Sequence, residues 1–478
     1  MTESGLSDPE SAVTVRNPWL RIALLGAIFL IGVGLRLHCI NEPLFDAYPE
    51  RQYRSAMIAR SYYWAGLSGI EPWRREIERI NLEKEGVLEP PLMEHLAAVG
   101  YRISGGEFFW IPRAVSITFW LIAGVGIYFL ARRLAGTDAA LISTAVFVLH
   151  PFGVYFSRCF MPDSLMIMLQ VLGLLAIVRY FEARTWGRIL TAAGISALAM
   201  FVQPKCVFMI FAGYGALALA EIGVRRVLID LRSWAFAAIA VAPTALWYVG
   251  GIMTGNQLQS QAGWTFVPGT IVKPFFWGGW LMRVQDVAGL LAPACAAVGT
   301  FFFARRSSRA LMLGLWAGYV LFGLVFSFHI RTHDYYQLQL LIVIALALGA
   351  LGATALRRAA DLLQSPAWAR VVVTGLVLTG LALSVGSYML KRREISERMT
   401  PPSEQRTYAF LSRLDPDLTR LVSNAREIGE AVHHSQKTLF LHHYDTNGYK
   451  YHGEVAAEGW PRTAMLRAET GGGGAPQT

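Results

Sequence analysis

Charged residues are scarce in this chain of 478 residues: Asp, Glu, Lys and Arg together make up 16% of it, whereas apolar residues make up 54%. A soluble domain usually carries about 25% charged residues. So little charge cannot cover the surfaces of the several soluble domains that this length would otherwise suggest. Much of the surface is therefore expected to face lipid.

Sequence motifs of several other protein classes are also missing. The cysteines show no CxxC spacing and indicate neither a zinc site nor a disulfide framework; they are Cys39, Cys159, Cys206 and Cys295. No GxGxxG or GxxxxGK[ST] loop occurs, so a soluble nucleotide is not an expected ligand. Long basic blocks and RNA-reading motifs are absent, and nucleic acid is not an expected partner. The net charge of +10 instead bears on membrane topology.

Long apolar runs recur along the sequence, each close to the roughly 20 residues that a helix needs to cross the hydrocarbon core of a bilayer. They predict an all-α polytopic membrane protein. About eleven transmembrane helices are expected, near residues 19–38, 113–131, 138–156, 163–181, 188–203, 206–221, 233–252, 286–304, 309–328, 336–356 and 369–389.

Arginine residues occupy every second short loop between these runs. With residues 1–18 in the cytoplasm, the cytoplasmic loops contain Arg132, Arg133, Arg179, Arg184, Arg188, Arg225, Arg226, Arg232, Arg305, Arg306, Arg309, Arg357, Arg358 and Arg370. Cytoplasmic loops of membrane proteins are enriched in Lys and Arg. The alternation therefore predicts a transmembrane domain over 19–389, with the N-terminus inside. The segments predicted outside are 39–112, 253–285, a small mixed α/β domain over 390–470, and a flexible tail over 471–478.

The first outer segment, 39–112, is too long for a simple connector. A helix is predicted over 50–64, with Tyr53, Met57 and Trp64 on one stripe. It would lie in the membrane interface, with Arg60 reaching out of the stripe toward water. A plain surface helix without a chemical role is the simpler alternative.

Two acidic positions in this segment frame the predicted helix. Asp46 comes just after the first span, at the mouth of the helical bundle. Glu89 precedes Pro90 and Pro91, and a helix is expected to begin at Pro91. By themselves these residues indicate only a turn or a helix start.

Several charged residues lie at the predicted outer ends of the helices. Arg158 and Asp163 flank a tight turn, Lys205 follows the next outer turn, and Arg331 precedes His333. Two interpretations stay open: these side chains anchor lipid headgroups, or they line a polar cavity that faces an anionic group. A metal site at the histidines of this end is not favoured, because no HExxH pattern occurs.

Four elements, taken in order, resemble the GT-C superfamily of membrane glycosyltransferases. They are Asp46 in a long first outer loop, Glu89-Pro90-Pro91, the stretch from Arg158 to Asp163, and His333-Asp334-Tyr335-Tyr336 before a Leu-rich helix. The resembling branch is the bacterial one related to dolichyl-phosphate-mannose–protein mannosyltransferases and lipid A aminoarabinose transferases.

The resemblance implies a hexosyl- or pentosyltransferase that takes a sugar from a polyprenyl phosphate. The sugar would pass, with inversion, to a hydroxyl or phosphate of a lipid, glycan or protein acceptor outside the bacterial cytoplasmic membrane, on the periplasmic side. Asp46 would be the base and Asp163 the second acidic position. Asp46 is followed by Ala47 rather than Glu, and Glu89 stands where aminoarabinose transferases have Lys. The acceptor is therefore left unassigned.

Chemistry assigns roles to the remaining candidates. A carboxylate can take the proton of an attacking hydroxyl, and positioned cations stabilise a departing lipid phosphate. The expected phosphate-binding residues are Arg158, Lys205, Arg331 and His333. The expected acceptor or sugar pocket contains Glu89, Tyr335 and Tyr336. No cofactor is firmly indicated, and a divalent cation is left open.

Two other functions remain as alternatives to a transferase. A lipid or lipid-linked-sugar flippase would place charges near the bilayer midplane, often in repeated halves. A non-catalytic scaffold would have no reason to gather carboxylates and cations on one side. Convergence of the outer-end residues in space is the observation that separates these alternatives.

Overall fold

The computed structural model describes residues 17–38, 40–45, 47–254, 258, 265, 267–363, 416–440 and 446–459. The chain divides into two compact units. The first, here called the membrane unit, comprises Met1–His38, Ser116–Arg158 and Pro162–Thr400. The second, here called the loop unit, comprises Cys39–Val115, Cys159–Met161 and Pro401–Thr478.

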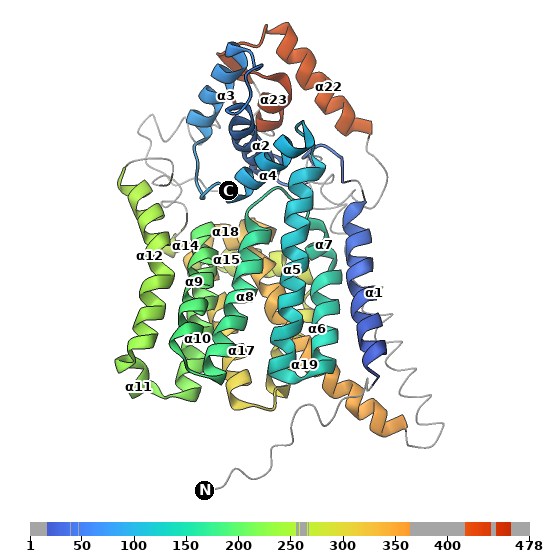
Figure 1. Cartoon of the computed structure of the whole chain (residues 1–478), viewed down its shortest axis with the longest axis vertical. Coiled ribbons are helices and arrows are strands. Elements are labelled where there is room, and N and C mark those ends of the chain that lie inside the picture. Colours follow the sequence, from blue (N-terminus) through green and yellow to red (C-terminus); the bar gives the residue numbers. More distant parts are fainter. Residues whose placement is uncertain are drawn as a thin grey trace. The chain divides into compact units, whose positions relative to one another are not determined.

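The membrane unit is built from helices that run side by side (Figure 1). Its helices are α1 (Pro18–Leu37), α5 (Trp110–Ala135, of which the first residues belong to the loop unit), α6 (Thr137–Leu149), α7 (Pro151–Phe156), α8 (Asp163–Glu182), α9 (Trp186–Val202), α10 (Val207–Glu221), α11 (Val224–Ile229), α12 (Leu231–Met253), α14 (Pro268–Ile271), α15 (Pro274–Ala288), α16 (Leu291–Gly299), α17 (Arg306–Val325), α18 (Ser327–Thr332) and α19 (Leu338–Leu363). Short 3₁₀ turns are η1 (Pro204–Cys206), η2 (Thr300–Phe302) and η3 (Asp334–Gln337).

Seven of the described helices are long and apolar enough to cross a membrane, or eight spans if one bent pair counts as one. The predicted class, an all-α polytopic membrane protein, is confirmed. The seven coincide with the predicted spans near 19–38, 113–131, 163–181, 206–221, 233–252, 309–328 and 336–356. The predicted span at 188–203 is the shorter α9, and the one at 369–389 lies outside the described residues.

Two predicted spans are wrong as continuous helices. In place of 286–304, α15 and the pair α16–η2 meet at an angle of 88°. Gly289 adopts φ +67 at this point, a left-handed conformation that ends α15. In place of 138–156, α6 stops at Leu149 and α7 begins at Pro151, whose nitrogen cannot donate to a continuing helix.

Two glycines one helical turn apart bring α17 against α10. A Cβ added at Gly314 would lie 2.5 Å from the carbonyl oxygen of Ala212, and one at Gly318 would lie 2.7 Å from Cα of Met209. Side chains at these positions would therefore force the two backbones apart. Small residues four apart are a common means of close helix packing in membranes.

The loop unit joins segments that are far apart in the sequence. It contains α2 (Pro49–Trp64), α3 (Pro72–Glu85), α4 (Leu92–Ser104), α22 (Pro416–Ala431), α23 (Thr446–Gly453) and two parallel strands, β1 (Thr438–Phe440) and β2 (Ala457–Gly459). Asn81 Nδ2 donates to the carbonyl oxygen of Val455 at 3.0 Å, so the first loop and the C-terminal segment share a core. The helix-like stretch expected at 403–414 lies outside the described residues.

The helices predicted at 50–64 and from Pro91 are present as α2 and α4. The expected position of Arg60 is wrong, however. Its side chain does not reach toward water: it is buried, with Nη1 3.0 Å from Glu78 and Nε 2.7 Å from Glu107. Because α2 is buried on most of its sides, it is a core helix of the loop unit rather than a surface helix.

Candidate functional site

A buried ion pair lies at one end of the membrane unit. Asp163 is the first residue of α8, and Lys205 lies in η1, the turn between α9 and α10. Lys205 Nζ donates to Asp163 Oδ1, and Gln203 Nε2 lies 3.4 Å from Oδ2. Asp163 is 0% and Lys205 5% exposed. Two of the charged residues singled out in the sequence, 42 positions apart, are thus in direct contact.

Aromatic rings surround the ammonium group of Lys205. Nζ lies 5.1 Å from the ring centroid of Tyr335 and 4.8 Å from that of Tyr336. Rings at these distances attract a cation, and more strongly when water is excluded. The imidazole of His333 lies 5.5 Å from the Tyr335 ring and 5.9 Å from the Tyr336 ring, between centroids. His333 and the short turn η3 that follows it therefore bring one phosphate candidate and both tyrosine candidates for the sugar to one cluster.

Two buried glutamines support this cluster, and the sequence analysis did not single them out. Gln339 Nε2 lies 3.4 Å from the carbonyl oxygen of Lys205, at the limit of a hydrogen bond. Gln170 Nε2 donates to Gln339 Oε1 at 3.0 Å. Both side chains are almost fully buried. Each interrupts an apolar run on a membrane helix, and such polar interruptions are the signal that could have found them.

The third cation, Arg331, is held by aromatic side chains. Its guanidinium carbon lies 5.0 Å from the Phe275 ring centroid and 5.3 Å from that of Phe328. Within the described part of the chain Arg331 forms no ion pair. Phe328 in turn lies 6.4 Å from the ring of His333, so Arg331 adjoins the cluster without touching Asp163.

Arg158 is fully buried and has a charged neighbour that the sequence analysis did not name. That neighbour is Arg36, near the end of α1, and the two positive charges interact. Arg36 Nε donates to Ser157 Oγ at 2.8 Å, and Nη1 donates to the carbonyl oxygen of Gly32 at 2.9 Å. Arg36 falls inside a predicted span, where an arginine is costly unless it serves a polar site.

The last two candidates differ from the others in their placement. Glu89 belongs to the loop unit, where it forms an ion pair with Arg51 of α2 at 2.6 Å. Asp46 lies outside the described residues. The structure therefore groups Asp163, Lys205, Tyr335, Tyr336 and His333 directly.

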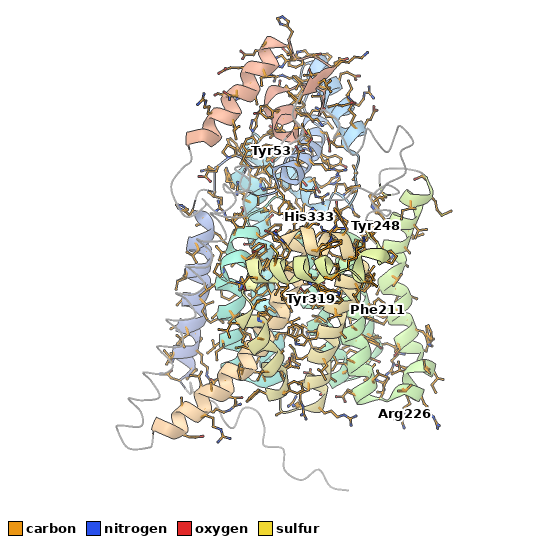
Figure 2. All side chains as sticks on the ribbon, turned by 180° about the vertical axis from the view of Figure 1, so that it is seen from behind. Tyr53, Phe211, Arg226, Tyr248, Tyr319 and His333 are labelled. Carbon is orange, nitrogen blue, oxygen red and sulfur yellow. The ribbon has the colours of Figure 1, made fainter. Side chains whose placement is uncertain are left out.

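The two ends of the membrane unit differ in character. His333 lies near one end and Arg226, from a predicted cytoplasmic loop, lies near the other (Figure 2). Among the described residues no group of three or more His, Cys, Asp or Glu side chains is placed to hold a metal ion. What the His333 end offers instead is a buried ammonium group, a neighbouring guanidinium and tyrosine rings, which together can receive an anion and a sugar.

Known proteins resemble the chain in sequence over one part and in fold over most of it. The sequence profile of a family described as dolichyl-phosphate-mannose-protein mannosyltransferase matches residues 88–247. No curated protein matches the sequence significantly.

Solved structures of two proteins resemble the fold. The archaeal oligosaccharyltransferase AglB from Archaeoglobus fulgidus, in complex with an inhibitory peptide and a dolichol-phosphate, is 15% identical with a TM-score of 0.58. That match covers 92% of this chain but only 64% of AglB. ArnT from Cupriavidus metallidurans in the apo state is 16% identical with a TM-score of 0.55, covering 94% of this chain and 88% of ArnT. These likenesses show that the chain shares the fold of these two proteins, and the expected GT-C fold is confirmed.

Proposed function

We propose that the protein is a glycosyltransferase that moves a sugar from a polyprenyl phosphate to a hydroxyl or phosphate of an acceptor. The observation that carries the proposal is the buried Asp163–Lys205 pair beneath Tyr335 and Tyr336, at the end of the membrane unit opposite Arg226. The family profile over 88–247 supports a sugar-transfer reaction. The dolichol-phosphate in the AglB complex supports a polyprenyl-phosphate donor.

The cations are assigned to the donor phosphate. When the bond between sugar and phosphate breaks, negative charge grows on the departing lipid phosphate. Fixed cations in a water-poor site stabilise that charge strongly. Lys205 and Arg331 are the phosphate ligands in this proposal, with Arg158 and His333 beside them. Tyr335 and Tyr336 are assigned to the sugar.

The two aspartates receive different roles. The Asp163 carboxylate already accepts a hydrogen bond from the ammonium group of Lys205. It is therefore assigned to orient that ammonium group rather than to take a proton from the acceptor. Asp46 is assigned as the base that takes the proton of the acceptor hydroxyl. A single displacement follows: the acceptor oxygen bonds to the anomeric carbon, the bond to phosphate breaks, and the configuration inverts.

The assignment of Asp46 is tested with one variant. A strain that lacks the protein should accumulate the lipid-linked sugar donor, which mass spectrometry of the lipid extract identifies. Asp46→Asn keeps the size of the side chain but cannot take the proton, so turnover should fall about 10²–10⁴-fold while donor binding survives. Glu42→Gln, in the same segment, is the matched control and should restore transfer. Near-normal transfer by a folded, donor-binding Asp46→Asn protein would remove Asp46 from the mechanism.

The site is proposed to face the outside of a bacterial cytoplasmic membrane. In a cysteine-free background, a membrane-impermeant thiol reagent applied to intact spheroplasts should label a cysteine at the exposed position Gln436 and miss one at the exposed position Arg306. The orientation rests on the Arg-rich loops. The opposite labelling would place the His333 end of the membrane unit in the cytoplasm.

A further inference from the structure

A cavity of about 320 Å³ opens within the loop unit. Its walls combine charged, polar and aromatic side chains. They include Arg60, Arg74, Glu107, Phe109, Arg426 and His452. Small-ligand pockets typically measure about 300–1,000 Å³, so the cavity has room for a small ring-shaped molecule.

One wall of the cavity is held rigidly by Glu107. Its Oε2 accepts from Arg60 Nε at 2.7 Å and from the Tyr451 hydroxyl at 2.8 Å. Its Oε1 accepts from Trp64 Nε1 at 2.8 Å. Arg60 also donates to Glu78 at 3.0 Å, behind the wall. Because both carboxylate oxygens are engaged by side chains of the loop unit, this wall is preorganised before any ligand arrives.

One guanidinium group that lines the cavity, that of Arg426, has no carboxylate partner in the described part of the chain. Arg74 pairs with Glu454 at 3.0 Å. Arg426, exposed on α22, forms no ion pair in the described part of the chain. The other two guanidinium groups of the lining, those of Arg60 and Arg74, are paired with carboxylates. The unbalanced charge lies at Arg426.

His452 adds hydrogen-bonding capacity without adding charge. Burial, together with the positive charges of Arg60 and Arg426, lowers the pKa of His452 to about 3. The imidazole is therefore neutral near pH 7, and its Nε2 lies 2.8 Å from the Tyr53 hydroxyl. Tyr451 and Phe109 stand beside it, with their ring centroids 5.1 Å and 5.9 Å from the imidazole.

We propose that this cavity binds an acidic saccharide. The sugar ring would lie between Phe109 and the mixed polar wall, and its carboxylate or phosphate substituent would pair with Arg426. Sugar hydroxyls need both donors and acceptors, and the lining supplies them through Arg74, Glu454 and His452. A purely apolar ligand would leave these groups unpaired, which is costly.

This site also deepens the proposed function. In the proposed transferase the acidic saccharide is part of the acceptor. Only this role as acceptor rests on the proposed function. Binding itself does not require transfer. It can therefore be measured without any donor, and failure of one proposal leaves the other intact.

Binding is tested on the full-length protein in detergent by calorimetry and saturation-transfer NMR. The probes are D-glucuronate, D-glucose 1-phosphate, D-glucose and inorganic phosphate. Glucuronate or glucose 1-phosphate should bind more tightly than glucose and than inorganic phosphate, and the tighter of the two identifies the substituent. Arg426→Gln should weaken that binding about tenfold, the loss expected of one charge-assisted hydrogen bond.

Arg420→Gln is the matched control, because Arg420 is an exposed arginine of the same helix that does not line the cavity. It should leave binding unchanged. Phe109→Ala should weaken the two acidic sugars but not inorganic phosphate. Equal binding of inorganic phosphate and the acidic sugars, or equal losses in the two arginine variants, would overturn the proposal. So would the absence of binding by both acidic sugars.

Discussion

Arg60 of the loop unit and Lys205 of the membrane unit are both buried cations paired with carboxylates, yet their surroundings differ. Arg60 contacts two carboxylates and the carbonyl oxygen of Tyr451, and the Tyr451 ring centroid lies 3.4 Å from its guanidinium carbon. Lys205 has one carboxylate and two tyrosine rings. The first network is saturated, with two carboxylates on one cation, whereas the second is unsaturated, with one carboxylate on its cation. Burial alone therefore does not distinguish a structural cluster from a functional one.

The charged groups of the two units that are not neutralised by an ion pair also differ. In the described part of the membrane unit, Arg36 and Arg331 form no ion pair, so this unit holds cations without a paired carboxylate. In the interior of the loop unit, burial instead raises the pKa of Glu50, Glu78 and Glu94 to about 7. The membrane unit thus buries cations without a paired carboxylate, whereas the interior of the loop unit holds carboxyl groups that are partly protonated near pH 7.

The largest expected effect is on the saturated network. Arg60→Met would leave Glu78 and Glu107 buried without their cation, and removing one partner of a buried pair typically costs about 3–5 kcal/mol. The thermal midpoint of the detergent-solubilised protein should fall by several degrees. Arg79→Met removes an arginine of α3 whose pairs with Glu76 and Glu83 are largely exposed, and should change the midpoint little. Equal shifts in both variants would mean that the Arg60 network does not carry the stability of the loop unit.

The next largest effect is the pH dependence of stability that arises from the buried carboxyl group of Glu94. Glu94 is buried and accepts from Ser55 Oγ at 2.7 Å, and its pKa is raised to about 7 from an ordinary value near 4.5. The unfolded chain therefore ionises Glu94 at lower pH than the folded one does. Glu94 therefore contributes about 3 kcal/mol to the free energy of unfolding below about pH 4.5. This contribution is lost as the pH rises to about 7.

This dependence on pH is measured by unfolding at pH 4.5 and pH 7.5. Glu94→Gln should reduce the fall in unfolding free energy between these values by about that amount, while Glu50 and Glu78 still contribute in both proteins. Glu83→Gln, at an exposed position of α3, is the control and should leave the fall unchanged. An identical fall in the Glu94→Gln protein would show that Glu94 is ionised in the folded state.

The unsaturated cluster predicts a smaller effect, on binding rather than on folding. Lys205→Met should weaken donor binding by about 1.5–3 kcal/mol, the worth of a charge-assisted hydrogen bond. Since the single variant leaves Asp163 buried without its cation, the neutral double variant Asp163→Asn/Lys205→Met separates the two consequences. It should regain stability but not donor affinity. Donor binding that returns with stability would assign Lys205 to folding alone.

Local sequence signals located much of this arrangement. Helix starts at Asp163 and after Pro91, and the placement of Lys205 and Tyr335 at helix ends, follow from prolines, charges and hydropathy within a few residues. The bend at Gly289 did not follow, because hydropathy measures how apolar a run is and not its direction.

Contacts between distant segments were also hidden from the sequence. Gln170 and Gln339 meet across 169 positions, and Asn81 meets Val455 across 374. The hydrogen-bond partner of a single polar residue in an apolar run lies far away in the sequence, so no local pattern identifies it. The same is true of the cavity in the loop unit, whose lining comes from the first loop and the C-terminal segment together.

The smallest expected effect completes the comparison with an ion pair that is not buried. Arg133 Nη1 contacts both oxygens of Glu182, at 2.7 and 2.6 Å, and both side chains are more than a third exposed. Its geometry is as close as that of the Arg60 network, but water screens it and competes for each partner. Exposed pairs contribute only about 0.2–1 kcal/mol. Arg133→Gln should therefore shift the thermal midpoint by no more than about 1–2 °C in low salt, and the shift should shrink as salt is added. A shift as large as that of Arg60→Met would show that short distance, and not burial with saturation, sets the strength of an ion pair in this protein.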